Sequence, residues 1–237
     1  MYNNSNYVTS YGSQHSIAAS FPILMRKVFT WMSLALAVTG LTAFGVSQSQ
    51  ELMITIVSSR VLLWGLLLGE VGLVVWLSAG INKMSLQTAT ILFILYSVLN
   101  GVTMSVIFLA YTMSSIASVF FITAGTFGAM ALLGYVTKTD LTSIGKLLFM
   151  ALIGLIIATV VNLFLNSTGL QMICSYVGVL IFTGLTAYDT QKIKNMLANA
   201  DDYDETAQKY AVLGALTLYL DFVNLFLHLL RIFGRRK

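Results

Sequence analysis

The sequence predicts an all-α polytopic membrane protein, and two observations carry this prediction. Of its 237 residues 57% are hydrophobic and only 9% are charged, and the mean hydropathy is +0.85, whereas soluble domains carry about 25% charged residues. The chain also contains several apolar runs of about 20 residues, the length that crosses a bilayer as a helix. These runs are continuous and do not alternate with a period of two. That pattern excludes a membrane β-barrel and leaves helices, which pair their own backbone groups in lipid.

Seven such runs predict seven membrane helices, over Val28–Val46, Val61–Ala79, Ala89–Thr112, Ile116–Val136, Leu147–Leu165, Met172–Asp189 and Ala211–Ile232. The connectors between them are short, so we expect one membrane domain of neighbouring antiparallel helices over residues 26–237. Residues 1–25 begin with a polar, uncharged stretch, which predicts a disordered cytoplasmic tail.

The positive residues predict the orientation, because cytoplasmic loops are enriched in lysine and arginine. With a cytoplasmic N-terminus only Arg60 lies outside before the last span, and the inside positions are Arg26, Lys27, Lys83, Lys138, Lys146, Lys192, Lys194 and Lys209. A seventh crossing would put the cationic tail "RIFGRRK" outside. The last segment therefore either crosses against the rule or returns as a re-entrant element.

Small residues inside the spans predict close helix packing, because lipid-embedded helices approach most closely where side chains are small. The glycines in question are Gly65, Gly69, Gly72, Gly125, Gly128, Gly178 and Gly184. The single cysteine, Cys174, is expected to be an apolar wall residue. The basic residues sit at helix ends without interleaved aromatics, so nucleic acid is not an expected partner.

Four ionisable residues fall within the spans: Glu70, Asp189, Asp221 and His228. Such residues are costly in lipid and usually face a bundle interior or a cavity. For Glu70 a structural hydrogen bond and a place on an ion or proton path both remain open. For His228 a polar contact is favoured over a pH-sensing role.

The last span carries a polar stripe whose members are three or four residues apart: Gly214, Thr217, Asp221, Asn224, His228 and Arg231. This spacing places them on one face of a helix. Apolar residues cover most of the remaining surface. The stripe either lines a path through the bundle or forms hydrogen bonds between helices.

Asp189 and Asp221 are expected at similar depth. Counting at 1.5 Å per residue puts Asp189 about 14 Å from Ala198 and Asp221 about 22 Å from Thr206. Two carboxylates that close cannot both ionise cheaply, so the pair would share one proton and act as a pH sensor. When ionised, the same oxygens suit Ca²⁺ as ligands. The alternative is two independent aspartates with separate neighbours.

The acidic run "DDYDE", residues 201–205, follows the sixth span. It lacks the spaced ligands and the glycine of an EF-hand loop. Acidic residues suit the positive end of a helix dipole, so the run is expected to cap the next helix. A cation-attracting vestibule is the less favoured reading.

Four stretches closely resemble the Bax inhibitor-1 family, also called the TMBIM or lifeguard family, and its bacterial branch in particular: "VLNGVTMSVIF", "ITAGTFGAMALLGYVTKTDL", "YVGVLIFTGLTAYDTQKIK" and "LYLDFVNLFLHLLR". The resemblance implies six helices packed around a central seventh. It also implies a pH-sensitive calcium leak, with the paired aspartates at Asp189 and Asp221 and the family's glutamate at Glu70. Some members have an arginine after the second helix that holds the pair; here Lys83 is the nearest cation.

The leading functional prediction is therefore a proton-gated cation leak with Ca²⁺ as the transported ion and no cofactor, in a bacterial inner membrane. His228, Asn224, Arg231 and Lys83 are the supporting candidates. The alternative is a regulatory protein that binds a membrane-embedded ATP-dependent protease. An enzyme is not expected: "LYLD" stands where diaspartyl intramembrane proteases have Gly-x-Gly-Asp. A proton-coupled carrier is disfavoured because no pair of broken helices is evident.

Overall fold

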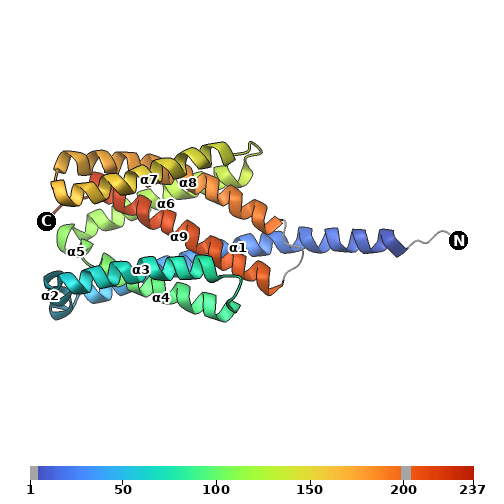
Figure 1. The fold of residues 1–237 in the computed structure, drawn as a ribbon, viewed down its shortest axis with the longest axis horizontal. Coiled ribbons are helices and arrows are strands. Elements are labelled where there is room, and N and C mark those ends of the chain that lie inside the picture. The colour runs from blue at the N-terminus through green and yellow to red at the C-terminus, as the bar shows by residue number, and fades with distance from the viewer. Residues whose placement is uncertain (1–4, 199–203) are drawn as a thin grey trace. The chain divides into compact units, whose positions relative to one another are not determined.

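The computed structural model describes residues 5–198 and 204–237, and their side chains from residue 23 onward. Within these ranges the chain is helical and forms no strand beyond one isolated bridge. In chain order (Figure 1) the helices are α1 (Ser5–Ser47), α2 (Gln50–Ser58), α3 (Arg60–Gly80), α4 (Leu86–Met104), α5 (Ile107–Ala110), α6 (Met113–Val136), α7 (Thr142–Leu165), α8 (Thr168–Ala198) and α9 (Glu205–Phe233).

Seven of the described helices are long and apolar enough to cross a membrane, each overlapping one predicted span. The predicted all-α polytopic class is confirmed, and the chain is a multi-pass integral membrane protein. The predicted run from Val61 to Ala79, for example, lies within α3. Its side chains face outward as lipid requires, with only 11% of its most apolar window buried.

Two helices begin directly after a capping side chain. Ser59 accepts a hydrogen bond from the Leu62 amide at the start of α3, and Thr112 accepts one from the Ser115 amide at the start of α6. Such caps satisfy amides that have no partner within the helix. α7 ends at Leu165, and the C-cap residue Asn166 has a left-handed φ of 50°, a conformation that asparagine tolerates.

α1 begins at Ser5, inside the segment predicted to be a disordered tail. Extending an existing helix costs less than nucleating a new one. The polar residues can therefore continue the membrane helix backward from Ile23–Ser47. Residues 1–4 lie outside the described residues.

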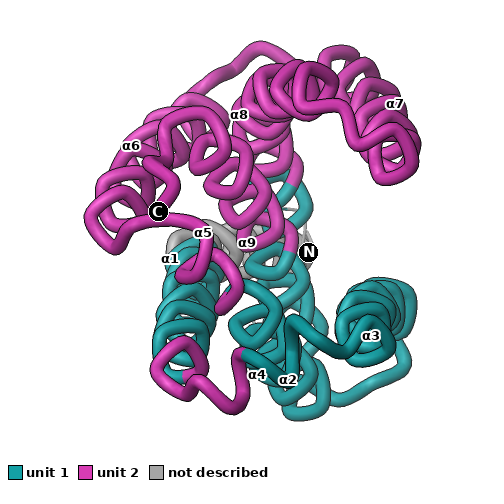
Figure 2. The backbone as a smooth tube through the Cα atoms, turned by 90° about the vertical axis from the view of Figure 1, so that its left-hand side faces the viewer, with its two compact units in different colours: residues 1–45, 54–104, 193–216 teal, residues 46–53, 105–192, 217–237 magenta. Residues whose placement is uncertain are grey.

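The helices group into two compact units, shown in Figure 2. Unit 1 holds residues 1–45, 54–104 and 193–216, and unit 2 holds residues 46–53, 105–192 and 217–237. α8 and α9 each contribute one segment to unit 1 and another to unit 2. Each unit is described below by itself.

Within unit 1 the start of α9 is fastened to the loop between α3 and α4. The Glu205 carboxylate accepts the Leu86 amide at 2.9 Å, Lys209 donates to the Met84 carbonyl, and Tyr210 donates to Asn82. Glu205 thereby caps α4 from another helix.

Asp204 caps α9 itself through the Ala207 amide at 2.8 Å. The predicted capping role of the acidic run is therefore confirmed at Asp204. Residues 201–203 of that run lie outside the described residues.

Within unit 2 the C-terminal residues fold back on the start of α6. Tyr111 and Arg236 form an antiparallel bridge, the Thr112 amide donates to the Arg235 carbonyl, and the Lys237 ammonium donates to the Phe108 carbonyl. Gly234 lies directly against the Tyr111 ring. The cationic tail is thus held at the end of unit 2 where α6 begins.

α9 is one uninterrupted helix of 29 residues, about 44 Å long at 1.5 Å per residue. A bilayer core is about 30 Å thick, so α9 is long enough to span it. A re-entrant element turns back within the membrane, and the described α9 has no break at which it could turn; the crossing itself stays a prediction. α9 is also the most buried of the seven candidate spans, with 72% of its apolar window buried. Its place at the centre of six helices stays a prediction.

Candidate functional site

A cavity of about 1040 Å³ lies within unit 2, between α7, α8 and the C-terminal part of α9. α7 supplies a largely apolar wall that includes Phe149, Met150 and Leu155. α8 and α9 supply most of the polar lining. Cavities of this size hold small ligands in many proteins, and here the polar groups gather on two of the three helices.

The structure brings the two predicted aspartates into contact in this cavity. Asp189 on α8 and Asp221 on α9 are 9% and 5% exposed, and their carboxyl groups form a hydrogen bond. Two ionised carboxylates have no donor between them, so this bond requires a proton on one of them. The second Asp221 oxygen, Oδ2, has no hydrogen-bond partner among the described residues.

The polar stripe of α9 faces this cavity. Its five lining members among the described residues are Thr217, Asp221, Asn224, His228 and Arg231. Gly214, the sixth predicted member, lies in unit 1 and packs against Ile193. Asn224 uses its amide nitrogen on the Leu220 carbonyl of its own helix, at 2.8 Å. The stripe thus lines a space and does more than join helices.

His228 is held tightly by α8. Its ring stacks on Phe182 with 5.7 Å between centroids, and a Cβ at Gly178 would lie 2.5 Å from the ring. Only glycine leaves room for the imidazole there. His228 Nδ1 has no hydrogen-bond partner within the described part of the chain. Gly178 was predicted as a close-packing position, but its contact with His228 and the stacking of Phe182 were not, because sequence spacing does not reveal which helix a buried ring will meet.

Lys192 is the cation whose charge acts on Asp189. It follows Asp189 by three residues, so both side chains lie on one face of α8. Its ammonium also lies 5.9 Å from the centre of the Tyr188 ring, within the range of a cation–π contact. In the sequence analysis Lys192 served only to predict orientation. Its three-residue spacing from Asp189 was the signal that could have revealed its electrostatic effect on that carboxyl group.

Lys146 enters the same cavity from α7. Its neighbour Gly145 packs directly on the Tyr188 ring. In the loop before α7, the Asp140 carboxylate accepts hydrogen bonds from the hydroxyl and amide of Thr142, which lowers the pKa of Asp140; the nearby charge of Lys146 acts in the same direction.

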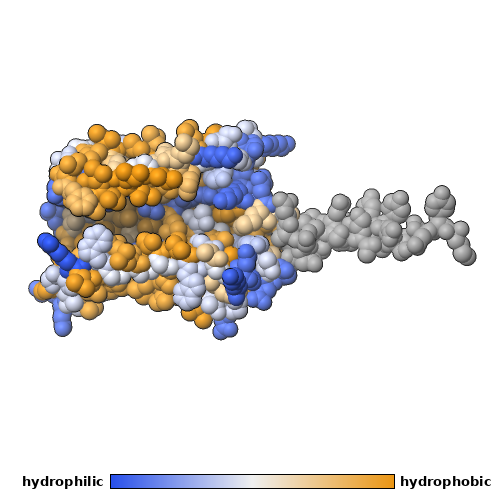
Figure 3. Space-filling model, viewed as in Figure 1, coloured by the Kyte–Doolittle hydropathy of each residue, from blue (hydrophilic) through white to orange (hydrophobic). Residues whose placement is uncertain are grey.

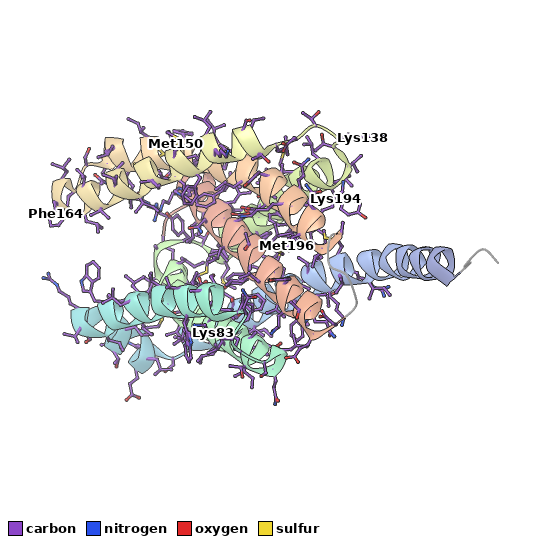
Figure 4. The ribbon with its side chains drawn as sticks, turned by 45° about the vertical axis from the view of Figure 1, so that its right-hand side comes forward. Lys83, Lys138, Met150, Phe164, Lys194 and Met196 are labelled. Carbon is purple, nitrogen blue, oxygen red and sulfur yellow. The ribbon has the colours of Figure 1, made fainter. Side chains whose placement is uncertain are left out.

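Glu70 and Lys83 belong to unit 1 and are not among the lining residues of this cavity. Glu70 is buried on α3 and accepts hydrogen bonds from Thr103 at 2.5 Å and from Asn100 at 3.3 Å, both on α4. These bonds join two neighbouring spans, as the structural interpretation of Glu70 requires. Lys83 is exposed in the loop between α3 and α4 and is labelled in Figure 4.

The carboxylate oxygens available to a metal ion in the cavity come from Asp189 and Asp221. Among the residues whose side chains the structure describes, no three histidine, cysteine, aspartate or glutamate side chains gather into a metal-binding group. Resident Ca²⁺ takes six to eight oxygen ligands. The pair therefore suits a cation that passes and keeps part of its water better than one that stays.

Sequence comparison identifies the family that this arrangement represents. Residues 22–237 match the sequence model of the family described as "Inhibitor of apoptosis-promoting Bax1". The chain belongs to the Bax inhibitor-1 family. The resemblance found in the four quoted stretches is thereby confirmed, and in this family member it extends over nearly the whole chain.

Several bacterial relatives of this Bax inhibitor-1 family chain match over most of their length. The protein named "Inner membrane protein YbhL" of Escherichia coli strain K12 is 50% identical over 220 residues, which are 92% of this chain and 94% of that protein. An uncharacterized protein of Borreliella burgdorferi is 47% identical over 213 residues, covering 90% and 92% of the two chains. An uncharacterized protein of Rickettsia prowazekii is 45% identical over 216 residues, covering 90% and 89%.

Proposed function

We propose that this protein is a pH-sensitive leak for Ca²⁺ or a similar cation, gated by the Asp189–Asp221 pair, in a bacterial inner membrane with the N-terminus in the cytoplasm. The observation that carries the proposal is the buried carboxyl–carboxyl hydrogen bond between α8 and α9, at the wall of a cavity. Because this hydrogen bond depends on one proton, it makes the contact between α8 and α9 sensitive to pH.

The direction of the pH effect follows from the same bond. With one proton on the pair, the bond joins α8 to α9. Loss of that proton removes the only donor, adds repulsion between two negative charges and offers free oxygens to a cation. All three effects favour the open, cation-accepting state, so flux is expected to rise with pH. Protons and Ca²⁺ then compete for the same oxygens.

The test is calcium flux into liposomes that contain the purified protein, measured across a pH series. Asp189→Asn and Asp221→Asn each replace the shared proton by a fixed amide donor, so the hydrogen bond no longer depends on pH. Either substitution should abolish the rise of flux with pH. Asp140→Asn makes the same change at an exposed carboxylate outside the cavity and should behave like the wild type.

Flux that is indifferent to pH and to both substitutions would overturn the proposal. A pH dependence that survives in Asp189→Asn and in Asp221→Asn would show that a group other than the pair senses the proton.

A further inference from the structure

One side of the cavity takes no part in the proposed leak. α7 presents an apolar wall to it, and two lysines from different helices, Lys146 and Lys192, line it as well. Ion passage over the aspartate pair needs no direct contact with the wall or with Lys146. A hydrophobic wall with cations at one end has the chemistry of a site for an anionic amphiphile.

We propose that the cavity binds an anionic phospholipid, with one acyl chain along α7 and the headgroup phosphate between Lys146 and Lys192. The site belongs to unit 2 alone, since every residue that lines it lies there.

Both lysines lie close to helix ends, where the polar headgroups of a bilayer are expected. Lys146 is four residues after the start of α7 at Thr142, about 6 Å along the helix, and Lys192 is six residues before the end of α8 at Ala198, about 9 Å along it. Packing of Gly145 on the Tyr188 ring, with the Lys192 ammonium 5.9 Å from that ring, gathers the two cations at the same end of the cavity. Basic pockets between membrane helices at such depth bind anionic headgroups.

The wall suits an acyl chain because it needs no hydrogen bonds and is open to lipid. Only 6% of the most apolar window of α7 is buried, and Met150, which lines the cavity, is 67% exposed. Figure 3 shows the hydrophobic surface along α7 in orange, with hydrophilic side chains beyond its N-terminal end. A chain can therefore enter sideways from the bilayer without opening the helix bundle.

The charge balance also calls for an anion. Three cationic side chains line the cavity, Lys146, Lys192 and Arg231, and the aspartate pair with its shared proton carries one negative charge. Asp140 offsets part of the charge of Lys146 from the loop before α7, but it is exposed to solvent and screened. The described lining is thus positive, which complements a phosphate and disfavours a zwitterionic headgroup.

The test is native mass spectrometry of the full chain in detergent with added phosphatidylglycerol or phosphatidylcholine of identical acyl chains. A basic residue near an anionic surface contributes about fivefold to binding. The Lys146→Gln/Lys192→Gln variant should therefore bind phosphatidylglycerol roughly 25-fold more weakly and phosphatidylcholine unchanged. The control, Lys83→Gln/Lys138→Gln, removes two exposed lysines that do not line the cavity (Figure 4) and should bind as the wild type does.

Equal retention of the two lipids by the wild type, or equal losses in the two double variants, would overturn the proposal. A second measurement needs no variant: phosphatidylglycerol with a diazirine on its acyl chain should label residues 149–160 of the wild-type protein in liposomes. Labelling confined to segments outside the cavity would also refute it. Neither readout involves ion flux, so failure of the leak proposal leaves this test intact.

Discussion

Gly134→Ala should loosen the contact between α6 and α8 that positions Asp189. A Cβ built at Gly134 would lie 2.8 Å from the Ala187 carbonyl carbon and 2.9 Å from its Cα, and closer still to the carbonyl oxygen. Ordinary contact begins near 3.4 Å, so the two helices must separate by at least about 0.6 Å. The obstacle is backbone and cannot rotate away. Asp189 follows Ala187 by two residues and would move with it.

The loss of unfolding free energy caused by Gly134→Ala can be measured against a matched control on the same helix. Overpacking costs about 1–3 kcal/mol, and a backbone obstacle argues for the upper part, about 2–3 kcal/mol. Alanine returns up to about 1 kcal/mol through its better helix propensity. Gly128→Ala gains the same propensity without the clash, since no described atom lies within 4 Å of a Cβ there. The difference in unfolding free energy between the two variants should thus be about 2–3 kcal/mol.

The assay is thermal unfolding of both purified variants in one detergent. The folded fraction that remains after heating is measured by size-exclusion chromatography. For a chain of this length about 1 kcal/mol corresponds to roughly 2–4 °C, so Gly134→Ala should melt roughly 4–12 °C below Gly128→Ala. Equal melting temperatures would refute the close approach of α6 and α8, and with it the argument that Gly134 fixes the position of Asp189.

Two further predictions concern unit 1. Thr103→Val removes the hydroxyl that donates to Glu70, and a buried acceptor left without its donor costs about 1–3 kcal/mol; Thr103→Ser keeps the donor and should restore most of the stability in thermal unfolding. Equal melting temperatures of Thr103→Val and Thr103→Ser would count against a structural role for this bond. Glu205→Ala removes the cap on the Leu86 amide and should cost about 0.5–1 kcal/mol. Glu205→Gln keeps an acceptor and should cost less; equal losses would point to charge and not to capping.

The membrane helices could be predicted closely because hydropathy directly measures the length of each run. The predicted span Val61–Ala79 differs from α3 by one residue at each end. The count from Ala198 assumed that the sixth helix continues past Asp189 through "TQKIKNMLA", and α8 does continue to Ala198. Helix counting also anticipated the contact of Asp189 with Asp221, because rise per residue is nearly constant along a helix.

Close packing at individual glycines could not be predicted, because composition does not reveal which face of a helix meets a neighbour. Of the seven expected positions, Gly178 and Gly184 lie against side chains of other helices. The other five have no described atom within 4 Å of a Cβ: Gly65, Gly69, Gly72, Gly125 and Gly128. Gly134 and Gly145, which were not predicted, lie directly against Ala187 and Tyr188, because they face α8 and not lipid.

The same reasoning explains why the polar stripe of α9 could be predicted and the cavity that it lines could not. A stripe on one helix is readable from three- and four-residue spacing, but the wall opposite it is set by the rotation of α7. Lys146 and Lys192 are 46 positions apart in the sequence, and only that rotation brings both to one cavity.

In the proposed leak, the lining charges let the carboxylate pair gate the cation without binding it permanently. With the shared proton in place, three cationic side chains face one negative charge, and Ca²⁺ is repelled as well as excluded from the oxygens. Loss of the proton changes this balance by one unit at the point where the cation must pass. A phosphate between Lys146 and Lys192 would make the net charge of the lining still less positive. It would act at a place in the cavity apart from the aspartates. In the two proposals taken together, the proton decides whether the carboxylates accept an ion, and the bound lipid sets how strongly the rest of the lining opposes that ion.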